Sequence, residues 1–210
     1  MRAPSFAPVG RSIYPDYMTD LDVFICPSTS LDKKHPPWTF YNPLDPTEKD
    51  PDDPLGTKKI YIDNFTYYCY DYVGYMFLGD ETDFNTLDNN IIMGTLFPAM
   101  AQPKTFDVNL TVNPPAIWPS GRKTTTLYRL RDGIERFMIT DINHPSGSAK
   151  GSSDIPVIWD TPSTTVAKFS HVPGGCNVAY LDGHVSFVKY PSGTFPVCEG
   201  FAQIHGKYTR

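Results

Sequence analysis

The segment His171-Val-Pro-Gly-Gly-Cys-Asn-Val-Ala-Tyr-Leu-Asp-Gly-His-Val-Ser-Phe-Val-Lys-Tyr190 decides the fold of this chain. Asp182-Gly183 accepts positive φ at both centres of a type I′ turn, so the segment predicts a β-hairpin with a two-residue loop. Such a loop pairs Val178 with Phe187. Because side chains alternate across a strand, this register gathers apolar residues on one face of the hairpin. That face consists of Val178, Tyr180, Val185 and Phe187.

The same segment resembles the terminal signature of the prepilin-type H-X9-DG family of pseudopilin-like proteins. That signature combines a His, a Gly-Gly-x-Asn turn, a short apolar strand and Asp-Gly-His. The matching residues are His171, Gly174, Gly175, Asn177, Asp182, Gly183 and His184. Ten residues rather than nine separate the first His from the Asp. The resemblance extends to Ser12–Asp20, Val23–Ser28, Leu130–Asn143 and Ile155–Asp160. It implies the globular head of a pseudopilin of the type II secretion or type IV pilin-like class.

Composition favours a strand-rich domain with many loops. The chain has 210 residues, and its 21 prolines and 15 glycines disfavour a helix bundle. A length of this size predicts one domain over residues 1–210. Net charge is −5 without a cluster of Lys or Arg, so nucleic acid is not an expected partner. No run approaches the roughly 20 apolar residues that span a bilayer.

The expected fold is therefore α+β, with a mainly antiparallel sheet, one or two helices and long Pro-rich loops. The Pro- and Asp-rich stretch 27–58 predicts an extended surface loop. Strands are expected at 23–26, 60–78 with a bulge at Gly74, 106–112, 157–159, 166–169 and in the hairpin. A Pro-rich connection is expected at 113–121. Helices are expected at 80–100 and 199–204, with a helical turn near 14–18. The apolar spacing of 127–141 also fits a helix, although Gly133 weakens it.

Three residues of the signature could support chemistry. Imidazole and carboxylate groups together suit a metal ion or a general base, which makes His171, Asp182 and His184 candidates. The hairpin separates them, because Asp182 lies at its tip and His171 a whole strand away. We therefore expect no catalytic residue. His171 is expected instead to hydrogen-bond across the loop that contains Asn177.

If the protein binds a cofactor, we expect it to be calcium. Ca²⁺ prefers carboxylate and carbonyl oxygens from loops. Asp141, Asp160 and Asp182 each end an apolar stretch, so they are candidate ligands at one edge of the sheet. Calcium-binding loops also occur in the heads of major type II secretion pseudopilins, which this chain resembles. The structural alternative is that these aspartates form turns after the apolar stretches.

The four cysteines are an even number without Cys-x-x-Cys spacing, which disfavours a zinc ribbon. Two disulfides are possible in an oxidising compartment, and buried free thiols are the alternative. Cys176 and Cys198 flank the hairpin and its return, so we expect them to pair, which leaves Cys26 with Cys69.

A tyrosine-rich stretch offers a candidate interface. Tyr68, Tyr70 and Tyr72 fall on one face of an expected strand. Tyrosine is favoured at interfaces, so this face could contact neighbouring subunits or carbohydrate. An ordinary aromatic strand that covers a core is the equal alternative.

The resemblance to this family implies a non-enzymatic subunit, exported to the periplasm or the outside of the cell. It would assemble with itself or with other pilin-like subunits in a secretion or pilus-like filament. The hydrophobic helix that the family's members carry is not found in this sequence, so we expect assembly to use the head or another partner. A secreted module that binds carbohydrate or another extracellular polymer is the alternative, and a metal-dependent hydrolase comes third.

Overall fold

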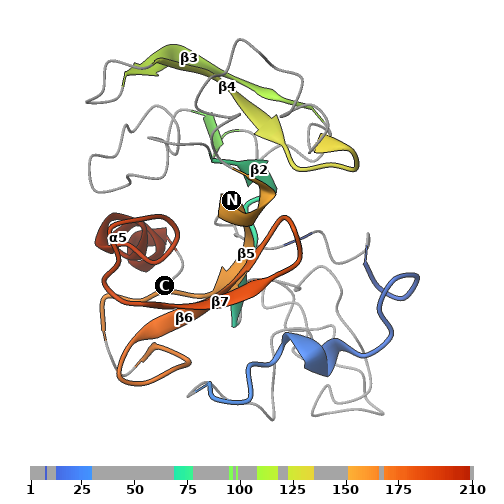
Figure 1. Ribbon diagram of the computed structural model, residues 1–210, viewed down its shortest axis with the longest axis vertical. Helices are drawn as coiled ribbons and strands as arrows, with labels where there is room; N and C mark the ends of the chain where they lie inside the picture. Colours follow the sequence, from blue (N-terminus) through green and yellow to red (C-terminus); the bar gives the residue numbers. More distant parts are fainter. Residues whose placement is uncertain are drawn as a thin grey trace, which may run out of the picture.

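The computed structural model describes residues 8, 13–29, 69–77, 95, 96, 98, 108–117, 123–134, 151–165 and 168–208. These residues form two antiparallel sheets and a terminal helix (Figure 1). The first sheet has the order β1-β5-β6-β7, with β1 (Tyr70–Asp71), β5 (Pro156–Asp160), β6 (Gly175–Tyr180) and β7 (Val185–Lys189). The second has the order β2-β4-β3, with β2 (Tyr75–Met76), β4 (Lys123–Arg129) and β3 (Leu110–Ile117). Helix α5 (Glu199–Tyr208) and the 3₁₀ helices η2 (Leu21–Phe24) and η8 (Ser152–Asp154) complete the described elements.

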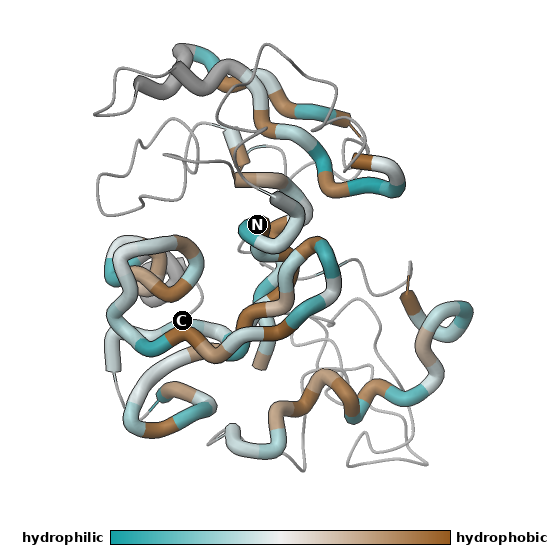
Figure 2. Tube along the Cα trace, in the orientation of Figure 1, coloured by the Kyte–Doolittle hydropathy of each residue, from teal (hydrophilic) through white to brown (hydrophobic). Residues whose placement is uncertain are grey.

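The predicted mainly antiparallel architecture with helix is thus present. A single apolar cluster takes residues from both sheets and from α5. Its largest members stack edge to face around Phe195, whose ring centroid lies 4.9 Å from that of Trp159 and 5.0 Å from that of Phe201. Aromatic pairs of this geometry add stabilisation beyond the area they bury. Figure 2 shows that apolar residues are spread along the strands of both sheets. The shared core holds the two sheets and α5 together.

The hairpin forms, but its register differs from the predicted one by one residue. The structure pairs Val178 with Ser186 and Ala179 with Val185. The tip is a three-residue loop, in which the Gly183 amide donates to the Tyr180 carbonyl and Gly183 has φ +89°. A type I turn followed by a left-handed Gly is the ordinary form of this loop.

This shift moves two large apolar side chains out of the predicted inner face. Val178 stays fully buried, whereas Val185 and Phe187 are 63% and 55% exposed. A one-residue slip exchanges the faces of a strand because the side-chain period is two. Asp182-Gly183 is compatible with both loop lengths, so the dipeptide alone does not fix the register.

Near the N-terminus, the strand predicted at 23–26 is wrong. Residues 21–24 form η2, whose first turn is capped by the Asp20 carboxylate accepting from the Asp22 amide at 2.9 Å. An Asp at this position competes with extended structure by satisfying a free amide. Where a helical turn was predicted just before it, residues 13–17 form a hydrogen-bonded turn rather than a helix, with the Tyr17 amide donating to the Ile13 carbonyl at 2.9 Å.

Two further expectations are corrected by β3 and β4. The strand predicted at 106–112 begins at Leu110 and continues through Pro114-Pro115 to Ile117, where a Pro-rich connection was expected. Pro is tolerated here because β3 is at the edge of the sheet as far as the described strands go, and its register shifts between Thr111 and Ala116. The segment that begins at Leu127 starts in β4 rather than in a helix, and its fully buried Leu127 faces the core.

Some of the remaining predictions fall on described residues and can be compared with the structure, and others do not. The strand at 157–159 and the closing helix are confirmed as β5 and α5. The strand predicted at 166–169 is not formed at Lys168 and Phe169, which follow a turn. The loop at 30–58, most of the helix predicted at 80–100, and residues 135–150 lie outside the described residues. Within the described part of the chain, no helix has the length and apolarity needed to cross a membrane.

Gly74 separates β1 from β2 and sends the chain from one sheet to the other. Its φ is +78°, a left-handed value that Gly adopts without strain. The Arg129 guanidinium occupies the space that a Cβ would fill, donating to the Gly74 carbonyl and, at 3.2 Å, to the Tyr72 hydroxyl. The expected bulge at Gly74 is therefore a crossover between two sheets.

Gly175→Ala tests the close packing at the start of β6. A Cβ at this position would lie 2.8 Å from the Val188 carbonyl oxygen and 2.4 Å from Phe187 Cζ. Because backbone cannot yield as a side chain can, we expect a loss of about 1–3 kcal/mol in the free energy of unfolding. Urea denaturation measures it. Gly193→Ala is the matched control, since nothing lies within 4 Å of its Cβ, and an equal loss in both variants would contradict the prediction.

Candidate functional site

Three distant parts of the chain meet beside the start of β6. Cys26 follows η2, Asp160 ends β5, and His171 lies in the loop before β6, while Asn177 is in β6 itself. Cys26 and Asp160 are each 1% exposed. The side chain of His171 is 26% exposed and provides the edge of the cluster that faces solvent. We refer to these four residues as the Cys26 cluster.

One oxygen of Asp160 organises the cluster. Oδ2 accepts from the Asn177 backbone amide at 2.7 Å and from the Asn177 side-chain amide at 3.0 Å. It also lies 3.1 Å from His171 Nε2. The other oxygen, Oδ1, is buried and has no hydrogen-bond partner among the described residues. The carboxylate thus links β5 to β6, and its buried Oδ1 is able to accept a further hydrogen bond.

His171 contributes the same nitrogen to all of its polar contacts in the cluster. Nε2 lies 3.1 Å from Asp160 Oδ2, 2.9 Å from Asn177 Nδ2 and 3.6 Å from Cys26 Sγ. A carboxylate at this distance favours a hydrogen on Nε2, which then donates to Oδ2. The same Nε2 lies 2.9 Å from Asn177 Nδ2, so His171 and Asn177 meet across the loop, but with a hydrogen on Nε2 both nitrogens donate to Asp160 Oδ2 rather than to each other.

Burial governs the electrostatics of the cluster. It raises the pKa of Asp160 above its ordinary value, while the Asn177 amides and His171 oppose that shift. Next to it, burial raises the pKa of Tyr70 to about 12, and its hydroxyl hydrogen-bonds to Cys26. Burial also raises the pKa of Cys69, whose sulfur accepts from the Cys26 backbone amide. Burial therefore makes each of these groups harder to ionise than it is in water.

The geometry argues against a Cys–His nucleophile. In such pairs a third group orients the imidazole through the nitrogen that does not face the thiol. Here Asp160 and Cys26 approach the same atom, His171 Nε2. The sulfur is also buried, which keeps a substrate carbonyl away from it. The cluster instead presents one sulfur, one nitrogen and one carboxylate oxygen, all within 4.8 Å of one another.

The Asp-Gly-His part of the signature lies elsewhere. Asp182 Oδ1 accepts from the His184 amide at 3.1 Å and from His184 Nδ1 at 2.6 Å, and both side chains are exposed. The backbone amide of His184, followed by its imidazole, lowers the pKa of Asp182. This local bond stabilises the hairpin tip, as Asp does in many turns.

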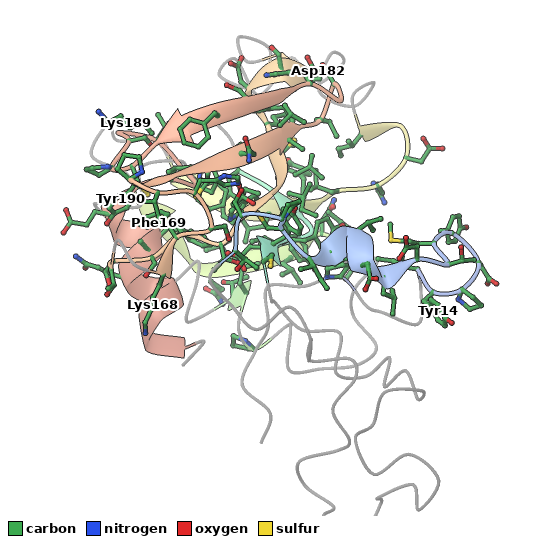
Figure 3. The ribbon with its side chains drawn as sticks, turned by 90° about the horizontal axis from the view of Figure 1, so that it is seen from below. Tyr14, Lys168, Phe169, Asp182, Lys189 and Tyr190 are labelled. Carbon is green, nitrogen blue, oxygen red and sulfur yellow. The ribbon has the colours of Figure 1, made fainter. Side chains whose placement is uncertain are left out.

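The structure does not bring the predicted calcium ligands together. In the register of β5 and β6, Trp159 pairs with Val178 and Pro156 with Tyr180, so Asp160 and Asp182 lie at opposite ends of this strand pair. Figure 3 shows Asp182 at the hairpin tip and Lys189 with Tyr190 at the other end. Asp141 lies outside the described residues. Calcium binding by these aspartates stays a prediction, but Asp160 and Asp182 cannot share one ion.

All four cysteines are free and buried, so neither predicted disulfide is present. Cys176 and Cys198 belong to the apolar core, where a thiol packs as a small hydrophobic group. Cys26 and Cys69 are neighbours, as their pairing assumed, but Cys26 Sγ is directed at His171. The alternative of buried free thiols describes the structure.

The tyrosine face is only half exposed where the structure describes it. Tyr70 and Tyr72 are half-buried, and their hydroxyls are engaged by Cys26 and Arg129 respectively. Tyr68 lies outside the described residues. The interface role of these tyrosines stays a prediction, and the contacts of Tyr70 and Tyr72 favour the alternative of an aromatic strand that covers a core.

Comparisons of this chain with protein-family models, with curated proteins and with solved structures find no match. The site is therefore interpreted from its own geometry.

Sequence reasoning found His171 and Asn177 together, but it assigned Asp160 to calcium and Cys26 to a disulfide. Cys26 and His171 are 145 residues apart in the sequence, so no local motif indicates that they are in contact. The one available indication was that each residue lies beside an apolar stretch, which places it near the core.

His171→Ala compared with His184→Ala tests the buried pair against the exposed one. Removing His171 leaves a 1% exposed carboxylate with fewer donors, and we expect a loss of about 2–3 kcal/mol. Removing His184 breaks an exposed pair, for which we expect a much smaller loss, because solvent screens it. Urea denaturation at neutral pH with a chelator present measures both. Equal losses would show that burial does not distinguish the pairs.

Asp160→Asn and Asp182→Asn are expected to change the pH dependence of stability in opposite directions. Because folding raises the pKa of Asp160, its favourable contribution is present below the unfolded value and is lost as pH rises through the folded value. Because folding lowers the pKa of Asp182, its contribution is present above the unfolded value and is lost as pH falls.

The measurement is the free energy of unfolding between about pH 3 and about pH 5, below the range in which His ordinarily titrates. Relative to Asp160→Asn, the unmodified protein should lose stability as pH rises. Relative to Asp182→Asn, it should gain stability. Slopes of the same sign would contradict the assignment of the two carboxyl groups.

Proposed function

We propose that this chain is a non-enzymatic assembly subunit that acts through the edge strand β7. It is the exported, pseudopilin-like head that the sequence resemblance implies, and it associates with further copies or with other pilin-like subunits in a filament. The observation that carries this proposal is the outer face of β7. Val185 and Phe187 are 63% and 55% exposed there, on a strand with no second neighbour among the described strands.

The position of these side chains supports an assembly role. An edge strand presents unpaired backbone groups that another chain can pair with. Natural proteins usually guard such edges with charge, yet only Lys189 at the end of β7 is charged. Val172, 74% exposed, lies next to His171, whose ring packs against Phe187 with a centroid separation of 6.1 Å. Apolar groups gathered in this way are typical of contact surfaces.

The Cys26 cluster supports the non-enzymatic part of the proposal. The Cys26 thiol and the Asp160 carboxylate are buried, and both contact the imidazole of His171. This arrangement suits a structural connection between the segments that carry them. The exposed apolar residues and the cluster lie side by side on one face of the first sheet, because Asn177 pairs with Phe187 and the His171 ring packs against Phe187. Assembly uses the exposed side chains of β7, and the cluster holds the neighbouring strands in place beside them.

The double variant Val185→Asp with Phe187→Asp tests the proposal. Burying a carboxylate in a contact between subunits is costly, so self-association should weaken by about tenfold or more. Sedimentation velocity over a concentration series measures the association, and electron microscopy shows whether ordered filaments form. Both side chains are exposed in the structure, so the fold of the single subunit should be retained.

Val108→Asp is the matched control, since Val108 is 53% exposed and lies just before β3 on the other sheet. It should assemble as the unmodified chain does. Assembly unaffected by the double variant would overturn the role of β7. A chain that stays monomeric at all concentrations, alone and with calcium, would overturn self-assembly and favour the polymer-binding alternative.

A further inference from the structure

The geometry points to a binding site for a divalent transition-metal ion of the Zn²⁺ class in the Cys26 cluster, with Cys26 Sγ, Asp160 Oδ2 and His171 Nε2 as ligands. This inference goes beyond the assembly role and is independent of it. Thiolate, imidazole and carboxylate are the three side chains that zinc uses in proteins. Here one of each converges from segments far apart in sequence.

The distances between the ligand atoms suit a small tetrahedral ion. With metal–ligand bonds of about 2.0–2.3 Å, the edges of a tetrahedron are about 3.3–3.7 Å. Sγ lies 3.6 Å from Nε2, and Nε2 lies 3.1 Å from Oδ2. The sulfur and the carboxylate oxygen lie within 4.8 Å of each other, so the three atoms fit around one ion once these two approach each other by up to about 1 Å.

The charges and the surroundings also suit the ion. A thiolate and a carboxylate together carry two negative charges, which a divalent ion neutralises in a buried place. The Asn177 backbone amide holds the carboxylate, as hydrogen-bonding groups around metal ligands commonly do. The partly exposed His171 gives the ion a way in from solvent.

One rearrangement accompanies binding. Asn177 Nδ2 now lies 2.9 Å from His171 Nε2, the atom that would bind the ion. The amide must therefore turn, which either presents its oxygen as a fourth ligand or leaves that position to water. Asp160 Oδ1, which has no partner among the described residues, can accept a hydrogen bond from such a water.

The donor set selects the kind of metal. Ca²⁺ takes six to eight oxygen ligands, whereas a sulfur and an imidazole nitrogen favour borderline and soft ions. The site should thus bind Zn²⁺ and Co²⁺ and discriminate strongly against Ca²⁺. Its three ligands join the segment after η2, the end of β5 and the loop before β6, so the ion would tie the N-terminal segment to the first sheet.

Cobalt provides the decisive experiment on the unmodified full-length chain. The protein is purified with reductant, dialysed against a chelator and titrated with Co²⁺, which is coloured where Zn²⁺ is not. We expect one equivalent to bind, with the intense near-ultraviolet band of a thiolate bound to cobalt and visible bands typical of tetrahedral geometry. Zn²⁺ should displace it at one equivalent and Ca²⁺ should not. A titration without the thiolate band overturns the proposal, whatever the variants do.

Variants then locate the site. Cys26→Ser and His171→Gln should each weaken Co²⁺ binding by about 100-fold or more and remove or shift the thiolate band. Cys198→Ser and His184→Gln are matched controls, a buried thiol in the core and an exposed imidazole beside Asp182, and both should bind as the unmodified chain does. Loss of binding in His184→Gln with retention in His171→Gln would assign the ion to the hairpin tip and overturn the proposal.

Discussion

The buried carboxylate of Asp160 is the constraint on which the arrangement of the first sheet depends. A carboxyl group that is 1% exposed must be compensated by donors, because its desolvation costs several kcal/mol. The backbone and side chain of Asn177 and the imidazole of His171 supply those donors at one oxygen. Their convergence fixes how the end of β5 meets β6. It also fixes where the loop before β6 must pass.

The same carboxylate explains why two parts of one sequence signature have different roles. His171 and Asn177 are drawn inward to Asp160, whereas Asp182 and His184 bond to each other at the exposed tip. The segment is therefore a structural unit with a buried polar end and an exposed apolar side. Val185 and Phe187 face outward because the inner face of the strand pair is already filled, with Val178 and Cys176 fully buried there.

Local sequence was sufficient for the elements with strong short-range signals. The hairpin and β5 were predictable from strand alternation and a turn dipeptide, and the closing helix forms where it was expected. The register was not, because Asp182-Gly183 fits loops of two and of three residues, and only packing against the rest of the sheet chooses between them. Likewise η2 formed where an apolar run favoured a strand, since Asp20 caps the turn.

The sequence pointed to the residues of the candidate site, but it did not predict that they lie together. His171, Asn177, Asp160 and Cys26 were each singled out, but for separate reasons. They lie together only because Cys26 contacts His171, which is 145 positions away in the sequence. No local pattern around either residue predicts this contact. Pairing the cysteines by their position along the chain failed for the same reason. Cys176 and Cys198 are held by core packing, and Cys26 lies against an imidazole.

The crossover at Gly74 has a mechanical consequence. Only three residues separate Asp71 in β1 from Tyr75 in β2, so this tether cannot let their two Cα atoms move more than about 14 Å apart. A force that pulls on β7 passes through β6 and β5 to β1, and from there along the tether into the second sheet (Figure 1). Two sheets joined in series in this way carry the same force, so the weaker of the two sets the force at which the protein yields.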